Sequence, residues 1–178
     1  KFIDEQLAAE SPEMVARFTR EATAAAQVKS PHVVQTFDHG VMDNGIPYIV
    51  MEMLEGEDLG QRLDRTGPLP LELVATILRQ TAHALVRAHA LGIVHRDIKP
   101  DNLFIVRQDD DDDEVMVKVL DFGVAKHTAV QSYSVVTATG AMVGTPGYMS
   151  PEQILSGKNV DFKSDLWSLG VVAYDAMI

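Results

Sequence analysis

The sequence predicts an α+β fold with two lobes, the second of them mainly helical. Four short segments rich in β-branched and aromatic residues predict two antiparallel hairpins. Three longer segments, marked by helix-start signals or by apolar residues at helical spacing, predict helices. The expected strands cover 33–37, 48–53, 103–106 and 115–120, and the expected helices cover 11–28, 70–90 and 164–178. With 178 residues, 46% of them hydrophobic, the chain is long enough to bury a core.

The first helix and the first hairpin are predicted from local signals. Residues 11–13, Ser-Pro-Glu, supply an N-cap, a first-turn proline and an acidic first turn, and Ser-Pro at 30–31 ends the helix. Asp-Asn-Gly at 43–45 is a turn signal between the two strands of the hairpin. Val34 and Phe37, in the first of these strands, are expected to be core residues.

The second half of the chain is predicted to begin at a lobe junction over 56–60. Apolar residues at helical spacing predict the long helix, and Gly92 is its stop signal. The apolar stripe consists of Leu71, Val74, Leu78, Leu85 and Val86. The acidic run at 109–114 is expected to be a solvated hairpin tip, because it lacks the glycine and the ligand spacing of a calcium loop. Residues 124–144, rich in Ser, Thr, Ala and Gly, are predicted to form a functional loop.

Composition excludes several function classes. The formal net charge of -11 argues against non-specific nucleic-acid binding, which depends on Lys and Arg. The chain has no cysteine, so disulfides and thiolate metal sites are excluded. No apolar run approaches the roughly 18 to 20 residues that cross a bilayer, and the first five residues do not form a signal peptide. We therefore expect a cytoplasmic segment without membrane contact, and any membrane anchor of the parent protein would lie outside it.

Three short motifs carry the chemistry. His-Arg-Asp at 95–97 follows a short apolar segment, Asn102 comes five residues after Asp97, and Asp-Phe-Gly at 121–123 follows the second hairpin. Phosphoryl transfer requires divalent cations against the phosphates, hard oxygen ligands for those cations, and a carboxylate that orients the incoming hydroxyl. Asp97, Asn102 and Asp121 supply that set of groups, so the motifs indicate phosphoryl transfer.

These motifs, with residues 144–152 (Gly-Thr-Pro-Gly-Tyr-Met-Ser-Pro-Glu), resemble the protein kinase family over essentially the whole chain. Their style resembles the eukaryotic-type (Hanks-type) Ser/Thr kinases of bacteria. The resemblance implies a two-lobed kinase fold, with an antiparallel sheet plus helix C in the N-lobe and a mainly helical C-lobe. By this resemblance, residues 1–54 are a partial N-lobe, from the strand 3 lysine to the hinge. Residues 55–178 are a partial C-lobe that reaches the middle of the central helix. We expect the domain to be truncated at both ends, and the activity of the fragment by itself stays open.

The resemblance assigns roles to the catalytic residues. Asp97 is implied to orient the substrate hydroxyl, while Asn102 and Asp121 are implied to hold Mg²⁺, or Mn²⁺, against the phosphates of ATP. Lys99 is implied to contact the γ-phosphate, where its charge would stabilise the transferring oxygens. Thr145 together with Lys99 resembles the Ser/Thr-kinase arrangement around the acceptor. The expected acceptors are therefore Ser and Thr hydroxyls of protein substrates.

A further set of residues is implied to bind the nucleotide. Glu21 lies at the edge of the inward face of the first helix, and a buried acid needs a partner. The resemblance makes that partner Lys1, the strand lysine that holds the α- and β-phosphates. The other expected nucleotide contacts are the gatekeeper Met51, the backbone of Glu52 and Leu54 at adenine, Asp58 at the ribose and Phe104 under adenine.

The resemblance also implies structural and regulatory roles. His95 is expected to tie backbone segments together rather than to act as a general base, and Asp165 is expected to brace the catalytic-loop backbone. Arg96 is expected to pair with a phosphate on residues 124–144, because Arg binds phosphate through two parallel hydrogen bonds. The candidate phosphosites are Thr128, Ser132, Ser134, Thr137 and Thr139. Activation by autophosphorylation, with a homodimer as one route to it, follows as an expectation.

Two other functions are weighed against the kinase. A pseudokinase would keep the fold without turnover, and loss of Asp97, Asn102, Asp121 or Glu21 would favour it, but all four are present. A small-molecule phosphotransferase of related fold would share an Asp and an Asn. It would not be expected to carry the peptide-platform sequence Gly-Thr-Pro-Gly-Tyr at 144–148.

Overall fold

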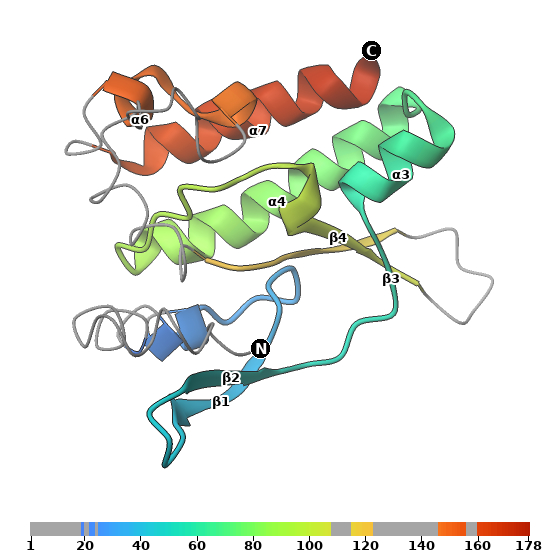
Figure 1. The fold of residues 1–178 in the computed structure, drawn as a ribbon. Helices are drawn as coiled ribbons and strands as arrows, with labels where there is room; N and C mark the ends of the chain where they lie inside the picture. The colour runs from blue at the N-terminus through green and yellow to red at the C-terminus, as the bar shows by residue number, and fades with distance from the viewer. Residues whose placement is uncertain (1–18, 20–21, 24, 108–114, 123–145, 156–159) are drawn as a thin grey trace, which may run out of the picture.

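The computed structural model describes residues 19, 22–23, 25–107, 115–122, 146–155 and 160–178, which are drawn in colour in Figure 1. The expected site residues outside this part of the chain are Lys1, Glu21, Thr128, Ser132, Ser134, Thr137, Thr139 and Thr145. The acidic run 109–114 and the predicted loop 124–144 also lie outside it. What the sequence predicts for these residues stays a prediction.

The described elements come in runs of strands and runs of helices, as in an α+β chain. Residues 19, 22–23 and 25–26 are helical, in agreement with the end of the first predicted helix. The elements that follow are β1 (Thr36–Val41), β2 (Pro47–Met51), β3 (Gly56–Asp58), α3 (Leu59–Thr66), α4 (Leu71–Ala90), η1 (Pro100–Asn102), β4 (Leu103–Val106), β5 (Met116–Val119), η2 (Pro146–Tyr148), α6 (Pro151–Leu155) and α7 (Phe162–Met177).

The elements are arranged in layers. Figure 1 shows α4 and α7 on one side of the sheet β3-β4-β5, and the hairpin β1-β2 on the other side of that sheet. The helix α4 contacts both α7 and β5, so it forms the middle of the larger part of the molecule. Among the described residues, no helix has the length and apolar character that crossing a membrane requires.

The first hairpin forms around the predicted turn, but its first strand begins later than expected. β1 and β2 pair antiparallel, and Gly45 has a φ of 84° at the turn. The predicted start at residue 33 was wrong, because residues 33–34 pair with Val119 of β5 instead. The prediction that Phe37 is a core residue was also wrong. The pairing register shifts at this residue, and its side chain is 62% exposed because such a shift turns a side chain away from its expected face.

The second sheet contains a strand that sequence patterns did not predict. β4 pairs with β5 as the predicted hairpin, and β3 pairs with the other edge of β4. Gly56 begins β3 with a φ of 143°, and a Cβ at this position would lie 2.1 Å from the carbonyl oxygen of Ile105. Only glycine fits this close approach of two backbones. The segment that was predicted to be a lobe junction therefore enters the sheet.

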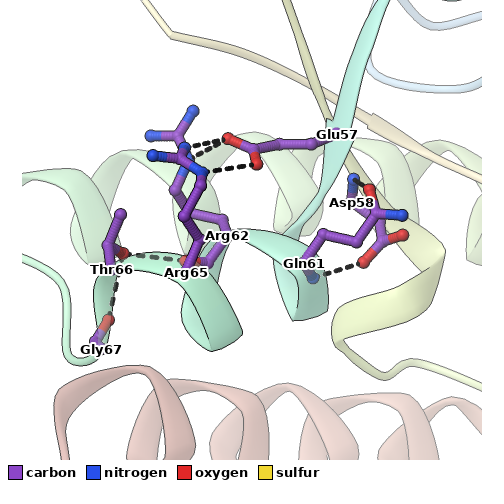
Figure 2. Close-up of polar contacts among 7 residues, drawn as sticks. All are labelled: Glu57, Asp58, Gln61, Arg62, Arg65, Thr66 and Gly67. Atoms are coloured by element: carbon purple, nitrogen blue, oxygen red, sulfur yellow. Dashed lines mark hydrogen bonds and ion pairs between the residues drawn. The ribbon is translucent and has the colours of Figure 1, made fainter.

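The helix α3 was missed as well, because it is short and mostly polar. Its N-cap is Asp58, whose carboxylate accepts a hydrogen bond from the backbone N–H of Gln61 at 2.8 Å (Figure 2). The Gln61 side chain accepts a hydrogen bond from the Asp58 N–H in return, which completes a capping box. Gly67 ends the helix with a φ of 71°. The pattern Asp-x-x-Gln was the signal that could have revealed the helix.

An ion-pair cluster joins β3 to α3. Figure 2 shows the Glu57 carboxylate facing the guanidinium groups of Arg62 and Arg65, and dashed lines join it to both. Hydrogen bonds from Arg65 and from Arg62 lower the pKa of Glu57 to about 2. The cluster is partly open to solvent, since the Glu57 side chain is 22% exposed and that of Arg65 is 60% exposed.

The core is built on α4. Its buried face is formed by Val74, Ile77, Ala84, Leu85 and Ala88. These side chains belong to one cluster with buried residues of β4, β5 and α7. Two residues of the predicted stripe are not buried, since Leu71 is 66% exposed and Val86 is 64% exposed. Leu71 lies in the first turn, and Val86 is rotated by about 100° from its neighbour Leu85 around the helix axis.

A buried amide fastens α4 to the free edge of β5. The side chain of Gln80 is 4% exposed; its Nε2 donates to the carbonyl oxygen of Val115 and its Oε1 accepts from the N–H of Val117, both at 2.7 Å. Next along the same edge, the Val119 N–H donates to the His32 carbonyl oxygen at 2.9 Å. On this edge of β5, the strand that leads to Asp121, the Gln80 side chain and the His32 backbone thus make the hydrogen bonds that a neighbouring strand would make.

We predict that Gln80→Leu lowers the free energy of unfolding by about 2 to 4 kcal/mol, because it leaves a buried C=O and a buried N–H without partners. Chemical denaturation measures the change. The control is Arg79→Leu at the exposed neighbouring position of α4, which should change stability by less than about 0.5 kcal/mol. Equal effects of the two substitutions would contradict the prediction.

We predict that Glu57→Gln destabilises the protein at pH 7 by about 1 kcal/mol or less, because partly exposed ion pairs are screened. The folded-state pKa of Glu57 is depressed from 4.5 to about 2, so its contribution is complete above about pH 4.5 and is lost as the pH falls toward 2. Denaturation midpoints of wild type and variant should therefore converge on acidification. Glu55→Gln, at an exposed position, is the control and should show no such convergence.

Candidate active site

The loop between α4 and η1 (residues 91–99), which the sequence predicts to be the catalytic loop, is held by one buried carboxylate. Asp165, on α7, is completely buried and accepts hydrogen bonds from the backbone N–H of His95 at 2.9 Å and of Arg96 at 2.7 Å. Its Oδ2 also lies 2.7 Å from Nε2 of His89 on α4. The prediction that Asp165 braces this loop is confirmed. The brace holds Arg96 in the left-handed region, with a φ of 65°.

His95 is a structural residue, as predicted. Its ring is fully buried; Nε2 lies 2.8 Å from the carbonyl oxygen of Leu120, and Nδ1 accepts from the N–H of Asp97 at 3.2 Å. Burial lowers the pKa of His95, which favours the neutral ring that can donate at Nε2 and accept at Nδ1. The ring also packs edge-on against Phe122, with centroids 4.8 Å apart. Both nitrogens are thus committed to backbone groups.

Asp97 and Asn102 form the centre of the site. The Nδ2 of Asn102 donates to the carbonyl oxygen of Asp97 at 2.7 Å and to its carboxylate Oδ2 at 2.9 Å. These two bonds fix the carboxylate relative to its own backbone, and they leave the amide oxygen of Asn102 as the atom suited to a cation. Lys99 lies between them in sequence, with its Nζ 3.3 Å from Oδ2 of Asp101.

Asp121 is tied to the same loop through its neighbour Leu120. The N–H of Leu120 donates to the carbonyl oxygen of Asn102 at 2.9 Å, and its carbonyl oxygen is the partner of His95. Asp121 itself has a φ of 47°, a conformation that Asp tolerates better than most residues. The three residues that were predicted to carry phosphoryl transfer are therefore brought into one hydrogen-bonded unit.

The donor set of this unit fits a hard divalent cation. One carboxylate and one amide oxygen are the ligand types that Mg²⁺ takes when substrate phosphates and water supply the rest of its octahedron. Within the described parts of the chain, no group of three or more His, Asp or Glu side chains forms a metal cage of its own. The pair Asn102 and Asp121 is suited to a cation that arrives with a phosphorylated ligand.

The expected nucleotide contacts that the structure describes lie on β3 and β4 and at the end of β2. Asp58 and Phe104 are direct cross-strand partners in β3 and β4, and Phe104 is paired on its other side with Lys118 of β5. The Nζ of Lys118 lies 2.7 Å from the carboxylate of Glu52, which follows β2. Lys118 carries no local sequence signal, because its contact with Glu52 spans 66 residues.

Met51 and Leu54 lie on either side of Glu52 in the sequence. Met51 is the half-buried last residue of β2, and the Glu52 carboxylate also accepts from the N–H of Gln35 at 2.6 Å. The Glu52 N–H also donates to the carbonyl oxygen of Gln35 at 2.9 Å. The side chain and the N–H of Glu52 are therefore engaged with protein groups, and its carbonyl oxygen is the main-chain group suited to a ligand. Asp58 has a structural role as the N-cap of α3, and its contact with the ribose stays a prediction.

A platform of residues 146–150 lies beside the catalytic loop. The hydroxyl of Tyr148 donates to Oδ2 of Asp175 on α7 at 2.5 Å, and burial followed by this bond raises the pKa of Tyr148. Its carbonyl oxygen accepts from the hydroxyl of Ser168 at 2.7 Å. A cavity of about 390 Å³ is lined by Tyr148, by Pro100 and Asp101, and by residues of α3 and the turn that follows it. The platform is anchored to α7, as the loop is.

The fold and these contacts form the candidate phosphoryl-transfer site, and comparison with known proteins identifies the family. The model of the protein kinase domain family matches residues 1–178. The chain therefore belongs to the protein kinase family.

Similar proteins include bacterial serine/threonine-protein kinases. The chain is 42% identical over 92% of its length to pkn3 of Myxococcus xanthus, and 41% identical over 94% to PknA of Corynebacterium glutamicum. It is 38% identical over 99% to PknL of Mycobacterium tuberculosis. The matched regions make up 29%, 34% and 41% of these relatives, so the chain spans well under half of their length.

Solved structures agree with the predicted fold. A mutant form of the kinase domain of Mycobacterium tuberculosis PknI superposes with a TM-score of 0.75 at 29% identity, covering 99% of this chain and 62% of that one. A structure of Rad53 in complex with AMP-PNP superposes with a TM-score of 0.71 at 29% identity, covering 90% of this chain and 37% of that one. The predicted kinase fold is confirmed.

We predict opposite effects for two buried hydroxyls near the platform. Ser150 stands where the kinase motif has Ala; it is completely buried, and its Oγ has no hydrogen-bond partner in the described structure. Ser150→Ala should raise the free energy of unfolding by about 1 kcal/mol, because an unpaired hydroxyl leaves the interior. Ser168→Ala removes a paired hydroxyl and should lower it by about 1 to 2 kcal/mol. Denaturation midpoints that move in the same direction would contradict this.

Proposed function

We propose that the protein is a serine/threonine kinase that transfers the γ-phosphoryl group of ATP to Ser and Thr hydroxyls of proteins, its own activation segment included. The observation that carries this proposal is the pair of hydrogen bonds from Asn102 to Asp97, together with the hydrogen bond that joins Asn102 to Leu120, the residue before Asp121. The names of the relatives, all serine/threonine-protein kinases, support the same activity.

In the proposed reaction, Asp97 orients the acceptor hydroxyl and receives its proton as the oxygen attacks the γ-phosphorus. The bond from that phosphorus to the bridging oxygen breaks, and ADP leaves. Asn102 and Asp121 would hold Mg²⁺ or Mn²⁺, which supplies positive charge against the phosphate oxygens when bound. Lys99 adds a cation at the transferring group. The hydrogen bonds from Asn102 support this role, because they preset the direction of the Asp97 carboxylate.

The nucleotide is proposed to bind at the junction of the two sheets. Adenine would meet the main chain of Glu52 and Leu54 beside Met51, with Phe104 below it. Asp58 would reach the ribose, and its cross-strand pairing with Phe104 supports a common location for these two contacts. Lys1 is proposed to hold the α- and β-phosphates, with Glu21 as its ion-pair partner; both residues lie outside the described part of the chain.

Thr145 and Arg96 are proposed to act in acceptor choice and in regulation. Thr145 would assist Lys99 at a Ser or Thr hydroxyl, and the cavity beside Tyr148 supports a protein segment as acceptor. Arg96 would pair with a phosphate on one of the five candidate phosphosites, with a homodimer as one route to autophosphorylation. The division into a partial N-lobe (1–54) and a partial C-lobe (55–178) and a cytoplasmic location remain proposals, as do the absence of membrane contact and of nucleic-acid binding.

We predict that the full-length protein incorporates phosphate from labelled ATP and Mg²⁺ into a generic basic protein and into itself, on Ser or Thr. Asp97→Asn should lower the rate by about 10²- to 10⁴-fold, because the substitution removes the proton acceptor. Asp43→Asn, the same chemical change in the exposed turn after β1, is the control and should keep wild-type activity.

Absence of transfer by the wild-type protein, despite tight binding of Mg²⁺-ATP, would contradict the proposal. The pseudokinase would then be the better description. Equal activity of Asp97→Asn and wild type would remove Asp97 from the mechanism while leaving the activity itself in place.

A further inference from the structure

One side chain joins the platform to the catalytic loop. Gln153, on the short helix α6, donates from Nε2 to the carbonyl oxygen of Arg96 at 2.9 Å. Its Oε1 accepts from the backbone N–H of Ser150 at 3.0 Å. A single amide therefore binds main-chain groups of both segments, which lie more than fifty residues apart in the sequence. Nothing in the local sequence pattern indicates this contact.

The carbonyl group that Gln153 binds belongs to a constrained residue. Arg96 has a φ of 65°, which is costly for a residue with a side chain and persists only where surrounding contacts hold it. Its N–H is held by Asp165 at 2.7 Å, and its C=O is held by Gln153. Two side chains from other segments thus fix the residue from both sides.

The same contact bears directly on the catalytic carboxylate. The C=O of Arg96 and the N–H of Asp97 belong to one planar peptide group. Gln153 holds the oxygen end of that group, and Nδ1 of His95 accepts from its N–H end at 3.2 Å. The orientation of this plane, together with the φ of Asp97, sets the direction in which the Asp97 side chain leaves the backbone.

We propose that Gln153 is a positioning residue that couples the platform beneath the acceptor to the orientation of Asp97. This inference rests on the proposed kinase function and adds a residue to it. Gln153 acts through the peptide group before Asp97 and does not touch the substrate. Its loss lowers the rate of phosphoryl transfer, and it leaves nucleotide binding unchanged, because none of the expected nucleotide contacts depends on it.

The amide group is the chemical requirement of this link. The position must present a donor to a carbonyl oxygen and an acceptor to an N–H at the same time. Glutamate of the same length keeps the acceptor for Ser150 but faces the Arg96 carbonyl with a second oxygen. Gln153→Glu therefore breaks the contact to the loop and keeps the contact within the platform. Gln153→Leu breaks both contacts.

The test compares Gln153→Glu, Gln153→Leu and wild type in the full-length protein with Mg²⁺-ATP and a Ser/Thr peptide substrate. The rate constant kcat is expressed per nucleotide-binding site, so that loss of folded protein does not register. Both variants should lose about 10- to 100-fold in kcat, the usual cost of a misplaced catalytic group, while the Kd for Mg²⁺-ATP stays within about twofold. Leu155→Gln, at an 83% exposed position of the same helix, should keep wild-type kcat.

Three other results would contradict the role of Gln153 or the kinase function. A kcat of Gln153→Glu within about twofold of wild type overturns the proposal, because the loop contact is then dispensable. Loss of nucleotide binding in both variants also overturns it, because Gln153 then supports the whole fold rather than Asp97. Absence of transfer by wild type itself contradicts the kinase function, and it is distinguished from both by the wild-type arm alone.

Discussion

The structure of the site depends on the buried carboxylate of Asp165. Removing an ion from water is costly unless hydrogen bonds compensate, and Asp165 receives them from two consecutive backbone N–H groups and from His89. Those partners belong to α4 and to the catalytic loop, whereas Asp165 belongs to α7. The conformation of the loop is thus determined by the packing of α7 on α4, where Val172 and Ala176 are buried. Catalytic geometry and the core are secured by the same helix pair.

Three further polar side chains hold the segments around the site in place. Gln80 holds the edge of β5, His95 joins the loop to the residue before Asp121, and Gln153 joins the loop to the platform. Each uses both of its polar atoms on backbone groups, so each link has a defined direction as well as a distance. Preorganisation of this kind reduces the rearrangement that a site needs when it binds its ligands, and in the proposed reaction it would lower the barrier to phosphoryl transfer.

Sequence patterns predicted the parts of the fold that repeat or that carry short motifs. The stripe of α4 and the turn at 43–45 are local signals, and the structure confirms both elements. The strand β3 has three residues and α3 is polar, so neither gives a periodic signal that exceeds its surroundings. Asp97, Asn102 and Asp121 were recognisable because their chemistry and order are distinctive. Lys118 and Gln153 were not, because their roles arise only when distant segments meet.

The ion pair of Glu52 with Lys118 links β5 of the larger sheet to the segment that follows β2. Lys118 lies on β5, three residues before Asp121, and Glu52 follows β2 directly. A 2.7 Å ion pair between them fixes the strand that leads to Asp121, the proposed metal ligand, relative to the segment that is proposed to bind adenine. Both side chains are only about one-fifth exposed, so solvent screens the pair less than a surface pair. The two ends of a bound nucleotide would therefore meet protein groups whose separation is already set before binding.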